Sequence, residues 1–166
     1  MTAPIRFLKL KDPHGHMSNF WPSSISWSGK LWPTSEHLYQ AQKHRLDPSY
    51  QEVIRLNPSP WSAAKLGRDR NPPMVSNWDS IKEDCMLTCL FLKYTQHANL
   101  KEQLLATGTA TIIEAGAHDS YWAEGSDGKG LNRLGCLLME TRAVLRTTEN
   151  VGPYIDQISQ LCGMYL

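Results

Sequence analysis

Residues 32–43 carry the clearest helix signal in the chain and read Trp32-Pro33-Thr34-Ser35-Glu36-His37-Leu38-Tyr39-Gln40-Ala41-Gln42-Lys43. After Pro33, the hydroxyl of Thr34 or Ser35 is suited to cap a helix N-terminus. The pattern therefore predicts a helix that runs from this cap through Lys43. Because they follow one another at helical offsets, four polar residues would share one face of it: Glu36, Tyr39, Gln40 and Lys43.

This polar helix face has two interpretations. At 1.5 Å of rise per residue, Glu36 and Lys43 would lie about 10.5 Å apart along the axis, which suits two groups that flank a small ligand. Polar residues on a helix more commonly form a face in contact with solvent. Position alone does not separate a ligand site from a solvated face.

Outward from this helix, the patterns predict a mainly helical α+β protein with a small β element. The β-prone pieces 5–8 and 25–27, with a turn signal at Ser28-Gly29, indicate a small hairpin or sheet, and a further strand is expected at 111–114. Apolar residues at helical spacing predict the remaining helices at 78–94, at 100–106 and from about 132 to 146. The segment after Thr147 is assigned no role beyond packing.

The size and composition fit one globular domain, expected over residues 1–166. Basic and acidic side chains, 17 and 16 in number, are mixed along the chain and give a net charge of +1. This balance supplies no basic stripe for nucleic acid and no field that draws the protein to a membrane. No apolar run reaches the roughly 20 residues that cross a bilayer, and residues 1–10 show no leader pattern. We therefore expect a cytoplasmic protein.

The four cysteines, Cys85, Cys89, Cys136 and Cys162, match no zinc or redox spacing. Cys85 and Cys89 lie within an apolar helical pattern, where a buried free thiol is common. No cluster of His, Asp or Cys has the spacing of metal ligands, so neither a metal nor another cofactor is expected.

Three other segments carry residues suited to ligand contact. Asp119-Ser120-Tyr121-Trp122 precedes a glycine-rich stretch, 124–130, which is either a phosphate cradle before a helix or a flexible connector. The loop 16–22 is polar and aromatic, and either contacts a ligand or plugs the core. Arg68 and Arg70, near Lys65, offer phosphate contacts or form a solvated basic patch.

These segments together resemble the NADAR family, also called YbiA-like. The resemblance covers roughly residues 16–146 and rests on motifs in family order: Ser18-Asn19-Phe20, residues 32–43, Leu66-Gly67-Arg68, Asp119-Ser120-Tyr121-Trp122, and Gly130-Leu131-Asn132-Arg133-Leu134-Gly135 with Leu138-Met139. One position departs from the family pattern, because Ala123 stands where a glycine usually follows the tryptophan. Its methyl group is expected to narrow the pocket floor or to restrict the backbone.

The resemblance implies an N-glycosidase that hydrolyses the ribosyl C–N bond of phosphoribosylaminopyrimidine intermediates of riboflavin biosynthesis. Two alternatives stay open: a hydrolase that removes ADP-ribose from guanine, free or in nucleic acid, and a module that binds ADP-ribose or a nucleotide without turnover. The ligand is thus a ribosyl-phosphate or ADP-ribose compound, with no membrane partner implied. The oligomeric state and the base released are left open.

Site residues follow from the chemistry and the matched motifs. A carboxylate below the sugar would stabilise the positive charge that develops as the C–N bond breaks, and Glu36 is the candidate. Lys43 would neutralise phosphate or attack a ring-opened sugar to form a Schiff base, and Asp119 would hold sugar hydroxyls or share acid and base work. Trp122 would stack on the base. The remaining substrate-binding candidates are Ser18, Asn19, Phe20, Tyr39, Gln40, Arg68 and Asn132.

Overall fold

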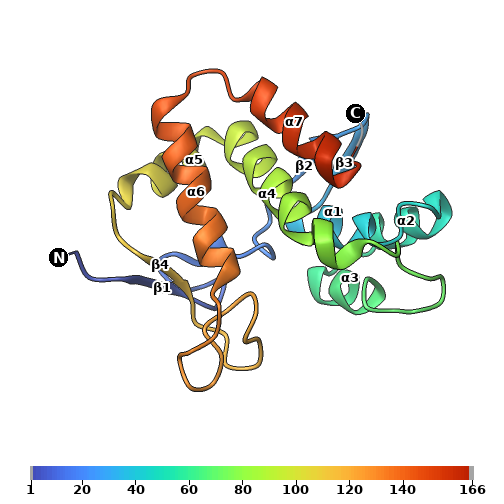
Figure 1. Ribbon diagram of the computed structural model, residues 1–166, viewed down its shortest axis with the longest axis horizontal. Coiled ribbons are helices and arrows are strands. Elements are labelled where there is room, and N and C mark those ends of the chain that lie inside the picture. The colour runs from blue at the N-terminus through green and yellow to red at the C-terminus, as the bar shows by residue number, and fades with distance from the viewer. Residues whose placement is uncertain (1, 165–166) are drawn as a thin grey trace.

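A computed structural model, which describes residues 2–164, confirms the mainly helical α+β fold (Figure 1). A short 3-10 turn, Gly15–Met17, accompanies the regular elements of this described part of the chain. These elements are β1 (Ile5–Phe7), β2 (Ile25–Trp27), β3 (Lys30–Trp32), α1 (Ser35–Gln42), α2 (Pro48–Arg55), α3 (Pro60–Leu66), α4 (Trp78–Gln96), α5 (Ala98–Ala106), β4 (Ile112–Glu114), α6 (Arg133–Thr147) and α7 (Gly152–Cys162).

The predicted helix after Pro33 is α1, and all eight of its residues are buried. Thr34 is the N-cap: its hydroxyl accepts a hydrogen bond from the backbone N–H of His37, a contact worth about 1 kcal/mol at a helix start. Burial on every side excludes the solvated helix face as an explanation of its polar residues. These side chains must instead meet protein groups or a ligand.

The four strands form two separate two-stranded sheets. β2 and β3 make the expected hairpin, whose turn residues Ser28 and Gly29 both have positive φ, as a type I′ turn requires. β1 pairs in parallel with β4, so that Phe7 lies opposite Glu114. This second pairing was not predicted, because it joins segments more than a hundred positions apart in the chain.

Helix α4 is the centre of the core. It packs against α1, α5, α6 and α7, and its last three turns are buried almost throughout. In Figure 1 it runs diagonally between the α1–α3 group and the α6–α7 pair. Cys85 and Cys89 lie buried on it as free thiols, as expected, and Cys162 of α7 is buried beside them.

The structure adds helices that the apolar pattern did not reveal. Asp47 caps α2 and Pro48 occupies its first turn, while Ser59 and Pro60 begin α3. A capping residue followed by proline is a start signal that the sequence analysis did not use. The segment after Thr147 forms α7, which covers one side of α4.

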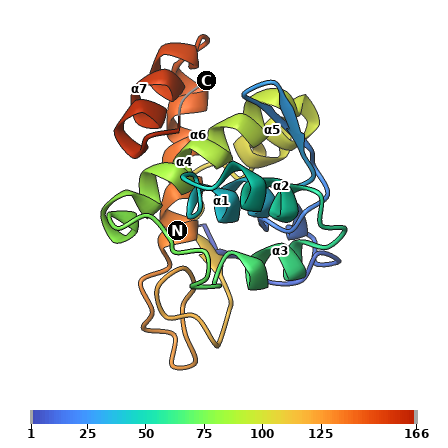
Figure 2. The same ribbon diagram turned by 90° about the vertical axis from the view of Figure 1, so that its right-hand side faces the viewer.

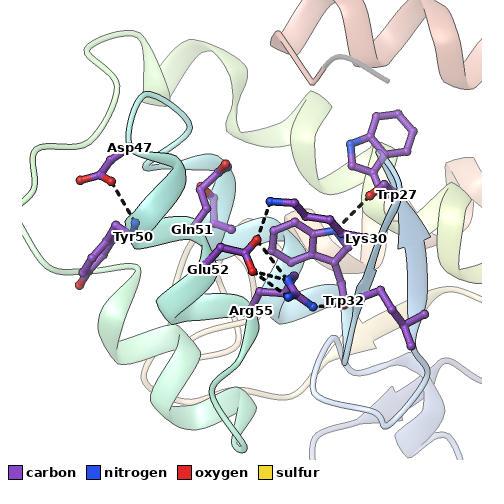
Figure 3. A network of polar contacts seen from close by, with 10 residues as sticks. Trp27, Lys30, Trp32, Asp47, Tyr50, Gln51, Glu52 and Arg55 are labelled. Atoms are coloured by element: carbon purple, nitrogen blue, oxygen red, sulfur yellow. Dashed lines mark hydrogen bonds and ion pairs between the residues drawn. The ribbon is translucent and has the colours of Figure 1, made fainter.

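The β2–β3 hairpin is tied to α2 by a network of charges (Figure 3). The carboxylate of Glu52 accepts hydrogen bonds from Lys30 and from Arg55, and Arg55 also donates to the carbonyl of Leu31 at 3.1 Å. These contacts hold the pKa of Glu52 down to about 2. The network fixes the chain just before it enters α1.

Among residues 2–164, no helix combines the length and the apolar character that a membrane span requires.

Candidate active site

A cavity of about 910 Å³ opens beside the N-terminal half of α4 and the buried helix α1. Its wall includes residues from both helices, from the segments around 8–11 and 18–20, and from the loop that joins β4 to α6. Figure 2 shows that loop projecting below α1. The cavity brings together nearly all the site residues predicted from sequence: Ser18, Asn19, Phe20, Glu36, Tyr39, Gln40, Lys43, Arg68, Asp119 and Trp122.

Glu36 lies in the buried part of this wall, with 7% of its surface exposed. Its backbone N–H donates to the carbonyl of Asn19 at 3.1 Å, which links α1 to the loop before it. Its Oε1 accepts a hydrogen bond from Gln40 Nε2 at 2.7 Å. Burial raises the pKa of Glu36, while this hydrogen bond and the charge of Lys43 act in the opposite direction. The carboxylate is therefore removed from water, and Gln40 and Lys43 offset part of the cost of burying its charge.

Gln40 holds Glu36 and is itself held by a close backbone contact. A Cβ atom at position 67 would lie 2.0 Å from Gln40 Oε1, so only glycine fits where the end of α3 meets α1. The amide oxygen is buried and has no hydrogen-bond partner among the described residues. One end of the amide faces Gly67 and the other donates to Glu36. The contacts of Gln40 therefore suit a residue that orients the Glu36 carboxylate.

Lys43, at the C-cap of α1, is a partly buried cation of the cavity. Its Nζ lies 5.5 Å from the ring centre of Tyr39 and 5.6 Å from that of Trp78, a cation–π distance. Among residues 2–164 it has no carboxylate within ion-pair distance. Burial lowers the pKa of Lys43 to about 8, although Glu36 acts to raise it. Burial thus brings the titration of this amine closer to neutral pH than that of an exposed lysine.

Aromatic rings form the wall next to Glu36. Trp122 meets Tyr39 edge to face, with ring centres 5.8 Å apart, and Tyr39 lies 5.2 Å from Trp78. Asp119 shapes this wall, because its Oδ1 accepts hydrogen bonds from the backbone N–H groups of Tyr121 and Trp122. One oxygen of the Asp119 carboxylate is thus committed to the loop.

Ala123 is buried in the cavity wall, and its methyl group faces Gly116, where an added Cβ would come within 2.9 Å. Its φ is negative, unlike that of Asn132, so the backbone accepts alanine without strain. The methyl group therefore occupies space at the cavity wall that a glycine would leave open, and the backbone around it is unstrained.

The loop that carries Ser18, Asn19 and Phe20 is anchored from below by Lys93. This lysine is fully buried in α4, and its Nζ donates to the carbonyls of His16 at 2.6 Å and Ser18 at 2.9 Å. Burial lowers the pKa of Lys93 to about 7. The loop thus lines the cavity on one side and covers the core on the other. Cavity lining and core covering, the two interpretations of residues 16–22, are compatible with each other.

Two sequence predictions need correction. Asn132 does not line the cavity: its Oδ1 accepts from the N–H of Glu114 and its Nδ2 donates to the carbonyl of Ile112, so both ends of its amide hold β4. The glycines of residues 124–130 also lie outside the cavity wall and serve as turns rather than as a phosphate cradle. Of the basic group near residue 68, Arg68 lines the cavity and Lys65 and Arg70 do not.

The cavity wall also contains residues that the sequence analysis missed. Glu114 ends β4 and is half-buried in the wall, and Trp61, with 61% of its surface exposed, packs edge to face on Phe20 at the mouth. Further cations line the same cavity from outside the matched motifs: Lys9, Lys11 and Lys82. The position of Glu114 at the carboxyl end of a predicted strand was the one available signal.

The part of the chain from 2 to 164 holds no group of three His, Cys, Asp or Glu side chains placed to share a metal ion.

The fold and the cavity define a small α+β protein whose cavity is lined by a buried carboxylate, a lysine and aromatic rings. Comparison with known sequences then places it: the profile of the NADAR domain matches residues 6–146, and the chain belongs to the NADAR family.

Two relatives and one solved structure illustrate this membership. The chain is 50% identical to N-glycosidase YbiA of Escherichia coli (strain K12), over 85% of this chain and 88% of that protein. It is 38% identical to riboflavin biosynthesis protein VVA0006 of Vibrio vulnificus, over 94% of this chain but only 43% of that protein. The NMR structure of the E. coli protein YbiA matches with a TM-score of 0.80 and 48% identity, covering 87% of this chain and 86% of that one.

Proposed function

We propose that this chain is an N-glycosidase that hydrolyses the ribosyl C–N bond of phosphoribosylaminopyrimidine intermediates of riboflavin biosynthesis. The observation that carries the proposal is the buried Glu36 carboxylate, which faces a cavity with an aromatic wall on one side and cations around it. The names of the relatives, N-glycosidase and riboflavin biosynthesis protein, support the reaction and the pathway.

In the proposed reaction, Glu36 stabilises the positive charge that develops on the sugar and orients the attacking water. A desolvated carboxylate suits this role because charge interactions are strong where water is excluded. Gln40 holds the carboxylate in place, and Trp122 contacts the base. Asp119 lines the same cavity, where its second carboxylate oxygen is available to the sugar hydroxyls.

Lys43 has two possible roles in this scheme, and its surroundings are compatible with both. As a cation beside Arg68 it would bind the substrate phosphate. As a neutral amine it would attack the ring-opened sugar and form an imine, a role supported by its lowered pKa and by the absence of an ion-pair partner among residues 2–164.

A second candidate substrate, guanine that carries ADP-ribose, is favoured by one observation. The cavity of about 910 Å³ is near the upper end of typical ligand sites and extends to a rim with Trp61 and several lysines. That rim suits a ligand with an additional phosphate and a second ring system. Ribosyl C1′–N cleavage is common to both substrates, so Glu36 would keep its role.

The test supplies the purified protein with each substrate in turn. A phosphoribosylaminopyrimidine is followed for release of ribose 5-phosphate, and DNA with ADP-ribosylated guanine for release of ADP-ribose. We expect the first release to be faster. The Glu36→Gln variant is the control, and a wild-type rate no higher than this control on both substrates would overturn the proposal.

A further inference from the structure

Glu114 adds a further carboxyl group to the cavity that Glu36 and Asp119 line. The backbone around it is fixed on both sides: its N–H donates to Asn132 Oδ1 at 3.0 Å, and its carbonyl accepts from the N–H of Glu124 at 3.0 Å. Its side chain makes no hydrogen bond to another residue in the described range 2–164. A rigid strand end therefore holds a free carboxyl group at the cavity wall.

The charges around Glu114 differ from those around Glu36. Its electrostatic neighbours are two other carboxyl groups, Asp119 in the following loop and Glu36 on α1. The cations on the elements packed against β4 already have other partners: Arg6 of β1 pairs with Glu124 and Arg133 of α6 with Glu83. On α6, Arg142 and Arg146 donate to backbone carbonyls of residues 105–110. The other charged groups of the same cavity wall are Lys9, Lys11, Lys43, Arg68, Asp79 and Lys82.

Burial together with the charges of Asp119 and Glu36 raises the pKa of Glu114 to about 7. Glu36 has what Glu114 lacks, a hydrogen bond from Gln40 and a favourable charge interaction with Lys43. Two carboxyl groups in unlike surroundings divide the work in many hydrolases, the protonated one acting as acid and the ionised one as stabiliser or base. The surroundings of Glu114 favour its protonated form, whereas Gln40 and Lys43 oppose part of the effect of burial on the pKa of Glu36.

We propose that Glu114 is the general acid of this site, which protonates the nitrogen of the departing base; the inference rests on the proposed glycosidase function. As the C1′–N bond breaks, its electron pair goes to the nitrogen, which takes the proton of the Glu114 carboxyl group. Water then bonds to C1′ and gives its proton to Glu36. Exchange with solvent returns Glu114 to the acid and Glu36 to the carboxylate, so the net change is hydrolysis.

The deciding variant is Glu114→Gln, measured on two substrates with the same sugar phosphate. One carries an aminopyrimidine, whose nitrogen needs a proton to leave. The other carries 4-nitrophenol, which leaves as the phenolate without one. Loss of a general acid costs on the order of 100- to 10000-fold. We expect that loss in kcat on the first substrate and a change within a few-fold on the second. Glu102→Gln, at an exposed position outside the cavity wall, is the control and should keep both rates.

The pH profile of the unmodified protein gives a second test that does not depend on how a variant folds. An acid must be protonated, so the aminopyrimidine rate should fall as pH rises through about 7, the pKa of Glu114. The nitrophenyl rate should lack this fall. Equal losses on both substrates in Glu114→Gln, or full activity on both, would overturn the assignment to Glu114. Absence of activity in the wild-type protein would instead overturn the glycosidase proposal itself.

Discussion

Gln40 lies one turn beyond Glu36 on α1, and its Nε2 donates to Glu36 Oε1 at 2.7 Å inside a fully buried helix. The pair is intrahelical, so the helix brings the two side chains together, and the close contact with Gly67 restricts the amide of Gln40. Burial strengthens this hydrogen bond, because a hydrogen bond to a charged group is stronger where solvent does not compete. Gln40 is thus a positioning residue, and its removal should be visible in the titration of Glu36.

Replacing Gln40 with methionine should shift the acid limb of the pH profile of kcat/KM to higher pH. A hydrogen bond to a charged group is worth roughly 1.5 to 3 kcal/mol, which corresponds to about 1 to 2 pH units. The acid limb moves to higher pH because the loss of a hydrogen-bond donor raises the pKa of a carboxyl group, and Glu36 must be ionised to act. Gln42→Met, on the same helix but outside the cavity wall, is the control. An unshifted acid limb in Gln40→Met would remove Gln40 from this role.

Glu36→Gln should lose about 100- to 1000-fold in kcat, because the amide keeps the shape and removes the charge. The same variant should melt at a higher temperature near neutral pH. Burial raises the pKa of Glu36, so the folded state loses stability as pH rises through the unfolded value and this group ionises. Calorimetry and steady-state kinetics on one sample check both effects. Turnover within a few-fold of wild type would displace Glu36 from the centre of the mechanism.

Lys43→Arg separates the two roles of this lysine. If the amine forms an imine, borohydride added during turnover should trap an adduct with the mass of the sugar phosphate, and Lys43→Arg should abolish both trapping and activity. Lys65→Arg, outside the cavity wall, should still give the adduct. We expect trapping. An active arginine variant with no adduct would assign Lys43 to phosphate binding and leave the role of Glu36 untouched.

Trp122→Ala should raise KM with little change in stability, because its ring lines the cavity and is only partly buried at the edge of the core. Stacking of a base on an aromatic ring is worth roughly 1 to 3 kcal/mol, or about 5- to 150-fold in KM. Trp21→Ala is the control, a half-buried tryptophan outside the cavity wall, and should leave KM unchanged. A large fall in melting temperature with unchanged kinetics would mean that Trp122 serves the core.

The helices with strong local signals were predictable. The cap and spacing of residues 34–43 gave α1, and the apolar repeat of α4 placed its start at Trp78 correctly. α2 and α3 were missed because they are short and bury few apolar side chains, so they show little helical spacing of apolar residues. The sequence signal for each was the capping residue and proline at its start. α7 was missed because the segment after Thr147 was not searched for a helix, although Pro153 in its first turn and the spacing of Ile155, Ile158 and Cys162 indicate one.

The site was predictable where one helix or one loop carries it. Glu36, Gln40 and Lys43 follow one another on α1, so spacing alone placed them together. Glu114 reaches the cavity only because β4 pairs with β1, a long-range contact that local patterns do not encode. Asn132 was misplaced for a related reason: its left-handed backbone, φ 49°, turns its amide toward β4 instead of the cavity.

The packing of α7 against α4 has a practical consequence for shortened versions of the protein. A version cut to the range matched by the NADAR profile, 6–146, would lose α7 and the packing of Phe91 against Tyr154. It would uncover the side of α4 that Ile155, Ile158 and Cys162 now shield from water. A contiguous apolar surface of that kind promotes self-association. Truncation at the family boundary should therefore yield aggregates even though the cavity residues are all retained.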